Sequence, residues 1–120
     1  MSAIKKSDIS EIIAREGTKV YQYFHPHNTL EGIDYSIARF TLESGKKSKL
    51  HKLQSSEVYY ILEGTAKLHI EDEVFVLEKD DSCYVPPMNK QFIENTGNTD
   101  LRFLCIVQPA WRQDDETILE

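Results

Sequence analysis

The chain has 120 residues, a formal net charge of −6 and a hydrophobic content of 40%, which fits one domain with a single core. An acidic chain lacks the basic face that neutralises phosphates, so nucleic-acid binding is not expected. No apolar run reaches the roughly 20 residues of a membrane span. The start, "MSAIKKSDIS", lacks the apolar segment of a secretory signal. We therefore expect a cytoplasmic protein with neither a nucleic-acid partner nor a membrane partner.

Residues 1–18 are predicted to form an N-terminal arm ahead of the main domain. In the segment "SDISEIIAREG", Ser7 or Asp8 is positioned to cap a helical turn that Gly17 would end. The segment is short, so we expect either a single helical turn or an arm that docks elsewhere on the protein.

Residues 19–110 carry the patterns of short β-strands. The segments "DYSIARFTL" and "TAKLHI" alternate in character along the chain, and "SEVYYILEG" reads as a strand that a glycine ends. About seven or eight such strands, separated by turn residues and accompanied by few helices, predict an all-β sandwich or barrel. The charged residues 111–120 are predicted to form a C-terminal tail at the surface or at a sheet edge.

One set of spaced residues resembles the first motif of the cupin superfamily. It runs from Gly45 through His51 and Glu57 to Gly64. The family motif normally carries a second histidine at the position that Leu53 occupies here. Two of the ligand types that cupins use are therefore present in register, and one is replaced by an apolar side chain.

The second cupin motif is matched, with changes, between Asp80 and Asn95. Gln91 replaces its histidine, and Pro86 and Pro87 mark the end or bend of a strand. The resemblance implies a single jelly-roll barrel, also described as a double-stranded β-helix, over most of the chain. It also implies a site inside the barrel, where metal-bearing cupins hold a divalent metal with three histidines and one glutamate.

The alternation of side chains along strands indicates which residues face this site. His51, Leu53, Glu57 and Tyr59 share one parity, so strands at these positions would point them into the barrel. His51 and Glu57 are good ligands for first-row metals, and Gln91 offers a weaker carbonyl oxygen. We expect Fe, Mn, Ni, Cu or Zn as the metal at His51, Glu57 and Gln91, with its occupancy left open. The pocket is expected to be lined by Leu53, Tyr59, Tyr84 and Ile93.

Residues near both ends of the predicted barrel offer further candidates. His25 and His27 follow the first strand, where they could cap the barrel mouth, line a dimer contact or supply a missing ligand. A solvated loop is the simpler interpretation of this segment. Trp111 follows the last strand, and we expect it to pack the tail back onto the barrel or against a partner subunit.

The sequence leaves two functions of different classes open. In one, the protein is a metal-dependent enzyme that acts on a small polar metabolite by isomerisation, decarboxylation or dioxygen chemistry. In the other, it is a non-catalytic barrel that binds a small molecule and has a degenerate metal site. The resemblance further implies a homodimer in which roughly the first 30 residues exchange a strand with the partner, since an edge strand would otherwise be left open.

Overall fold

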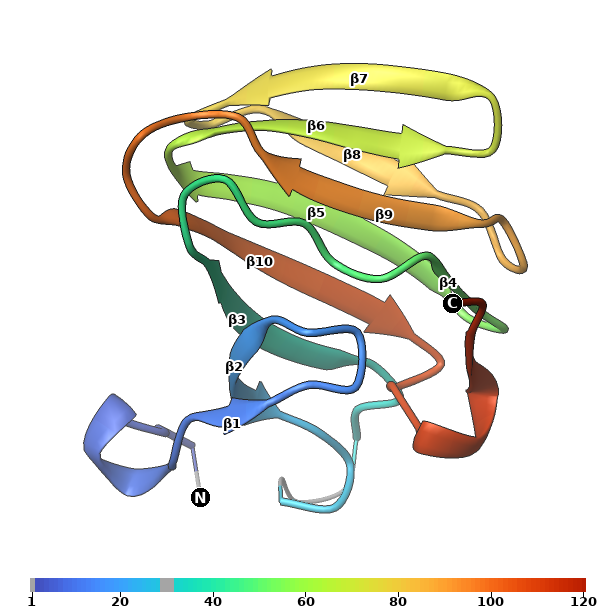
Figure 1. Cartoon of the computed structure of the whole chain (residues 1–120). Helices are drawn as coiled ribbons and strands as arrows, with labels where there is room; N and C mark the ends of the chain where they lie inside the picture. Colours follow the sequence, from blue (N-terminus) through green and yellow to red (C-terminus); the bar gives the residue numbers. More distant parts are fainter. Residues whose placement is uncertain (1, 29–31) are drawn as a thin grey trace.

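Two antiparallel sheets face each other in the computed structural model, which describes residues 2–28 and 32–120 (Figure 1). In order across the sheet, the six-stranded sheet contains β1 (Ile12–Ile13), β2 (Lys19–Phe24), β3 (Ser36–Leu42), β10 (Leu101–Gln108), β5 (Ser56–Glu63) and β8 (Ser82–Val85). The five-stranded sheet contains β11 (Glu116–Ile118), β4 (His51–Leu53), β9 (Gln91–Asn95), β6 (Thr65–Ile70) and β7 (Glu73–Glu78). The prediction of an all-β jelly-roll barrel is confirmed.

Helical structure in the described part of the chain is limited to the 3-10 turns η1 (Lys6–Asp8) and η2 (Gln113–Asp115). Neither turn is long or apolar enough to cross a membrane, and no other described segment forms a helix that could do so. The N-terminal segment is too short to hold a longer isolated helix.

Alternation of side chains separates the inner and outer faces of the sheets. In β10, the buried residues Phe103, Cys105 and Val107 alternate with Leu104 and Ile106, which face outward. This strand pairs with β3 on one side and β5 on the other along nearly its whole length. Its inner face therefore forms the centre of the barrel interior.

One end of the barrel is filled by apolar side chains. Ile61, Leu68, Ile93 and Leu101 are completely or almost completely buried and belong to one core cluster. They come from β5, β6, β9 and β10, so both sheets contribute to this packed end. The packing fixes the distance between the sheets and leaves the opposite end available for a site.

Gly64, the closing glycine of the first motif, lies between β5 and β6 and has a φ of +90°. A Cβ atom at this position would lie 3.0 Å from the carbonyl oxygen of Asp100. Glycine adopts this left-handed conformation without strain and lacks the clashing atom. Gly64 thus allows the chain to pass from the six-stranded sheet to the five-stranded sheet.

Both ends of the chain add edge strands to the barrel. In the arm, Ile12 pairs with Val20 of β2, which makes β1 an edge of the six-stranded sheet. In the tail, Ile118 pairs with His51 of β4, which makes β11 an edge of the five-stranded sheet. The tail therefore lies beside β4 of the first motif, and the arm reaches the same region through a hydrogen bond from the Lys49 amide to the Glu16 carbonyl at 2.7 Å.

Candidate ligand-binding site

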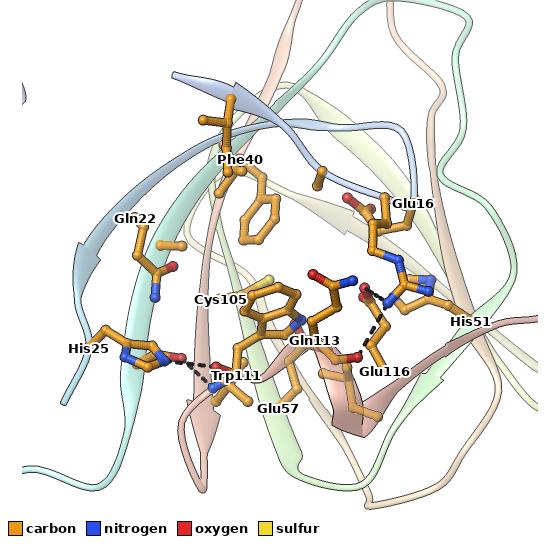
Figure 2. A pocket seen from close by; sticks show the side chains of 18 of the residues that line it. Glu16, Gln22, His25, Phe40, His51, Glu57, Cys105, Trp111, Gln113 and Glu116 are labelled. Carbon is orange, nitrogen blue, oxygen red and sulfur yellow. Dashed lines mark hydrogen bonds and ion pairs between the residues drawn. The ribbon is translucent and has the colours of Figure 1, made fainter. Parts of the chain in front are cut away.

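A cavity of about 500 Å³ lies among the arm, β2, β3, β4, β5, β10 and the C-terminal tail (Figure 2). Its lining is mostly apolar and includes the aromatic side chains of Phe40, Tyr59, Phe103 and Trp111. The rings of Phe40 and Phe103 are stacked with centroids 5.4 Å apart. Cavities of roughly 300–1,000 Å³ with mostly apolar walls are typical of small-molecule sites.

Glu57 of β5 lies in the cavity wall with 5% of its surface exposed. Its Oε1 atom accepts a hydrogen bond from Nε2 of Gln91 at 3.0 Å, and the thiol of Cys105 also hydrogen-bonds to this carboxyl group. The Oε1 atom of Gln91 in turn accepts a hydrogen bond from the Tyr59 hydroxyl. Side chains from β5, β9 and β10 therefore form one buried polar chain that fixes the position of the Glu57 carboxyl group.

Burial raises the pKa of Glu57 to about 7 because it disfavours the charged carboxylate. The hydrogen bonds from Cys105 and Gln91 oppose this increase, and the nearby charges of Glu16 and Glu116 add to it. A carboxyl group that titrates near neutral pH can either donate or accept a hydrogen bond from a bound molecule, and it can also transfer a proton.

His51 of β4 lies in the same wall with 4% of its surface exposed. Its Nδ1 atom is 2.7 Å from the carbonyl oxygen of Lys49, so Nδ1 carries the proton of this hydrogen bond. Burial lowers the pKa of His51, against the opposing effects of the Lys49 carbonyl and the Glu116 charge. The neutral ring thus keeps a lone pair on Nε2, and no hydrogen bond to Nε2 is present among the described residues.

Two further glutamates reach the cavity from the ends of the chain. Glu16 of the arm is buried, and its Oε1 atom accepts hydrogen bonds from the amide and the hydroxyl of Thr18. Glu116 of β11 lies 4.0 Å from Nη1 of Arg15, and the same Arg15 atom donates to the carbonyl oxygen of Gln113 at 3.3 Å. Burial raises the pKa of both carboxyl groups. Neither residue could be predicted from a local pattern, because only the edge pairing of β1 and β11 brings them to the site.

The mouth of the cavity is bordered by the tail and by the segment after β2. The Nε2 atom of His25 is 2.8 Å from the carbonyl oxygen of Trp111, and the Trp111 amide donates to Oγ of Ser36 at 2.9 Å. The tail therefore folds back onto the barrel. Figure 2 shows His25 and His51 on opposite sides of the cavity, so the view does not support His25 as a replacement ligand next to His51.

Only some of the predicted pocket residues line the cavity. Leu53 and Tyr59 line the cavity, whereas Ile93 is buried in the packed core and does not line it. Tyr84 requires a correction, because 56% of its surface is exposed on the outer face of β8. Val85 takes the inward position in that strand, paired with Glu57. The prediction that Tyr84 lines the pocket is therefore wrong.

The donor atoms do not fit a tightly held divalent metal. Among the described residues, no group of three or more histidine, cysteine, aspartate or glutamate side chains could hold a metal ion. Leu53 contributes no donor, and the oxygen of Gln91 accepts the Tyr59 hydrogen bond while its nitrogen faces Glu57. Only His51 and Glu57 remain of the predicted ligands, fewer than the three or four that zinc sites use. Gln91 serves to position Glu57.

The facing sheets form a small jelly-roll barrel that contains this cavity. The Cupin domain family matches residues 38–107, and the chain belongs to this family. An uncharacterized protein of Methanocaldococcus jannaschii is 37% identical over 113 residues, which cover 93% of this chain and 90% of that protein.

Two proteins of Thermotoga maritima are also similar to this chain. An oxalate-binding protein is 38% identical over 72 residues, which cover 59% of this chain and 60% of that protein. The crystal structure of a protein described as a predicted oxalate decarboxylase has a TM-score of 0.74 and 26% identity, covering 88% of this chain and 97% of that one. These similarities agree with the fold.

Proposed function

We propose that the protein binds a small organic molecule inside the barrel, and that Glu57 and His51 provide its main polar contacts. The observation that carries this proposal is the cavity of about 500 Å³, which has a mostly apolar wall with a few buried polar side chains. The similarity to an oxalate-binding protein supports small-molecule binding as a use of this barrel.

The polar groups in the cavity wall support the proposal that the cavity binds a molecule. Protein interiors are packed to a density that leaves few holes larger than a water molecule. The Nε2 atom of His51 lies in the wall without a hydrogen bond from the described residues. A ligand that donates a hydrogen bond to this atom would gain a contact that the protein itself leaves available.

Filling the cavity tests this proposal directly. Trp111 is the single tryptophan of the chain and lines the cavity, so its fluorescence reports on binding of the neutral probe N-phenyl-1-naphthylamine. Ala38→Phe places a ring in the cavity from β3, and Leu104→Phe adds a ring to the outer face of the neighbouring strand β10. We expect the first variant to lose probe binding and the second to keep it. Equal binding by both variants and the parent would contradict the proposal.

A second candidate function is metal binding at His51 and Glu57. It is favoured by the bond from Nδ1 to the Lys49 carbonyl, because metal-binding histidines are commonly oriented by such a bond while the other nitrogen binds the metal. Isomerase, decarboxylase or dioxygenase activity on a polar metabolite stays a prediction tied to this candidate. Iron, manganese, nickel, copper and zinc are the metals to test.

Leu53→His would restore a nitrogen donor in the cavity wall. We expect it to raise affinity for Zn²⁺ or Ni²⁺ by at least about tenfold, which corresponds to about 1.4 kcal/mol. Lys52→His is the matched control, because Lys52 precedes Leu53 on β4 and its side chain points to the other face. Equal metal affinity of Leu53→His and the parent in calorimetric titrations would show that the cavity cannot assemble a metal site.

A further inference from the structure

The charges around the cavity are unbalanced. Glu16, Glu57 and Glu116 reach it from the arm, β5 and β11, whereas Arg15 is the one lysine or arginine in its lining as described. Arg15 is paired with Glu116 and partly exposed. Glu16 and Glu57 therefore have no cationic side chain as a partner among the described residues.

The hydrogen bonds that Glu16 and Glu57 do receive come from neutral groups. Thr18 supplies its amide and hydroxyl to Glu16, and Gln91 and Cys105 supply theirs to Glu57. A buried carboxylate without a nearby positive charge is costly.

An independent observation comes from His51. Its Nδ1 atom lies 2.7 Å from the carbonyl oxygen of Lys49 and donates a hydrogen bond to it. The Nε2 atom is therefore an acceptor that faces the cavity with no donor from the described residues. The ionised forms of Glu16 and Glu57 are also acceptors only. A ligand that satisfies these three residues must present N–H or O–H donors.

The rest of the wall favours an apolar body on the same ligand. Phe40 and Phe103 are stacked, Tyr59 packs against Phe103 with ring centroids 5.4 Å apart, and Trp111 lines the mouth. Aromatic faces attract cations as well as apolar groups. An anion would instead meet the buried carboxyl groups of Glu16 and Glu57, whose ionised forms would repel it.

From this arrangement we infer that the ligand is an organic cation: an ammonium or related group with an apolar or aromatic body. The cationic group lies against Glu16, Glu57 and Nε2 of His51, and the body lies against Phe40 and Phe103. This inference rests on the proposed function, since it names the chemical class of the molecule that the cavity binds. It does not require a metal.

The test compares three compounds that share one body and differ in charge: 2-phenylethylamine, 2-phenylethanol and 3-phenylpropanoate. Binding at neutral pH is measured by calorimetry, with chelator present. We expect the amine to bind at least about tenfold more tightly than the alcohol, a difference of about 1.4 kcal/mol, and the carboxylate to bind more weakly than both.

Glu16→Gln and Glu57→Gln are each expected to reduce the preference for the amine over the alcohol by at least about fivefold while the alcohol still binds. Glu43→Gln is the control, because this exposed side chain pairs with Lys19 outside the cavity. Thermal unfolding of each variant establishes that it is folded. The amine preference is measured separately for each of the two cavity variants.

The outcomes separate this inference from the proposed function. If the alcohol or the carboxylate binds as tightly as the amine, or if the neutral naphthylamine probe binds and the amine does not, the ligand is not a cation although the cavity still binds ligands. An unchanged amine preference in both cavity variants also overturns the inference. If neither the probe nor any compound of the series binds, the proposed function itself is wrong.

Discussion

Glu57 illustrates at the residue scale how burial sets chemistry. In the unfolded chain its carboxyl group titrates near 4.5, and in the folded protein burial raises its pKa to about 7. Between about pH 4.5 and pH 7, the Glu57 carboxyl group is mostly protonated in the folded protein and mostly ionised in the unfolded chain. Stability contributed by this group is therefore complete below about pH 4.5 and is lost as pH rises through about 7. The shift corresponds to roughly 3 kcal/mol.

Glu57→Gln tests this dependence, because a glutamine keeps the shape of the side chain and cannot ionise. We expect the variant to be more stable than the parent above the titration range and to show a flatter dependence of unfolding free energy on pH. Urea denaturation at a series of pH values, with chelator present, measures both quantities. Glu43→Gln is the control, since its side chain is exposed. If Glu57→Gln kept the pH dependence of the parent's unfolding free energy, the raised pKa of Glu57 would be contradicted.

Tyr59 provides a second test at the same scale. Its hydroxyl donates to the buried Oε1 atom of Gln91, so Tyr59→Phe would leave that oxygen without its donor. We expect a loss of about 1–3 kcal/mol in the free energy of unfolding. Tyr84→Phe removes a hydroxyl from an exposed outer tyrosine and should change stability by less than about 0.5 kcal/mol. Equal effects of the two substitutions in urea denaturation would contradict the buried polar chain.

At the scale of elements, the arm and the tail close the site together. Nη1 of Arg15 donates to the Gln113 carbonyl at 3.3 Å and lies 4.0 Å from the Glu116 carboxylate. This is a link between two edge segments rather than a part of the packed core, and Arg15 is substantially exposed. Such contacts contribute little to global stability, but they hold together the segments through which a ligand would pass.

Arg15→Ala is expected to lower the free energy of unfolding by less than about 1 kcal/mol and to speed dissociation of the naphthylamine probe severalfold. Stopped-flow fluorescence of Trp111 measures the dissociation rate. Arg102→Ala is a matched control, because it breaks the ion pair with Glu63, which joins β10 to β5 far from the arm and the tail. The same dissociation rate in Arg15→Ala and the parent would show that this link does not hold the mouth closed.

The sequence predicted the site residues on those strands where the first motif indicates which side chains face inward. His51, Leu53 and Glu57 share one parity in a region of clear alternation, and all three line the cavity. The phase of "SCYV" was ambiguous, because Cys83 and Val85 form an inward set as plausibly as Ser82 and Tyr84. Polar or aromatic character at alternate positions does not by itself identify the inner face of a short strand.

Glu16 and Glu116 could not be predicted for a different reason. Their place at the cavity depends on the pairing of Ile12 with Val20 and of Ile118 with His51. Such edge pairings join segments that no local pattern connects, and β1 and β11 are only short strands. The barrel itself was predictable, since turn residues and two motifs in register specify it across residues 45–95.

At the scale of the whole molecule, the outer face of the six-stranded sheet carries a row of apolar side chains. The strand registers place Ile37, Ile106, Val58 and Tyr84 side by side across β3, β10, β5 and β8. Ile106 and Tyr84 are among the exposed large apolar residues. A continuous exposed apolar surface commonly marks an interaction site. We propose this face as a homodimer contact, distinct from the exchange of N-terminal strands that the resemblance implies.

The homodimer stays a prediction, and light scattering after size-exclusion chromatography tests it. We expect a dimer for the parent and a monomer for Ile106→Glu, because a charge in the apolar row would be buried at the contact. Val76→Glu is the control, since Val76 is 74% exposed on β7 of the other sheet. A monomeric parent, or a dimer that Ile106→Glu leaves intact, would argue against this contact.

We propose that the barrel interior binds a small organic molecule without a metal. The most direct measurement is equilibrium titration of chelator-treated protein with N-phenyl-1-naphthylamine, followed by energy transfer from Trp111, which lines the cavity. We predict saturable binding of one probe per chain that added zinc, nickel, manganese, copper or iron does not strengthen. Binding that appears only after one of these metals is added, or no saturable binding at all, would contradict the account.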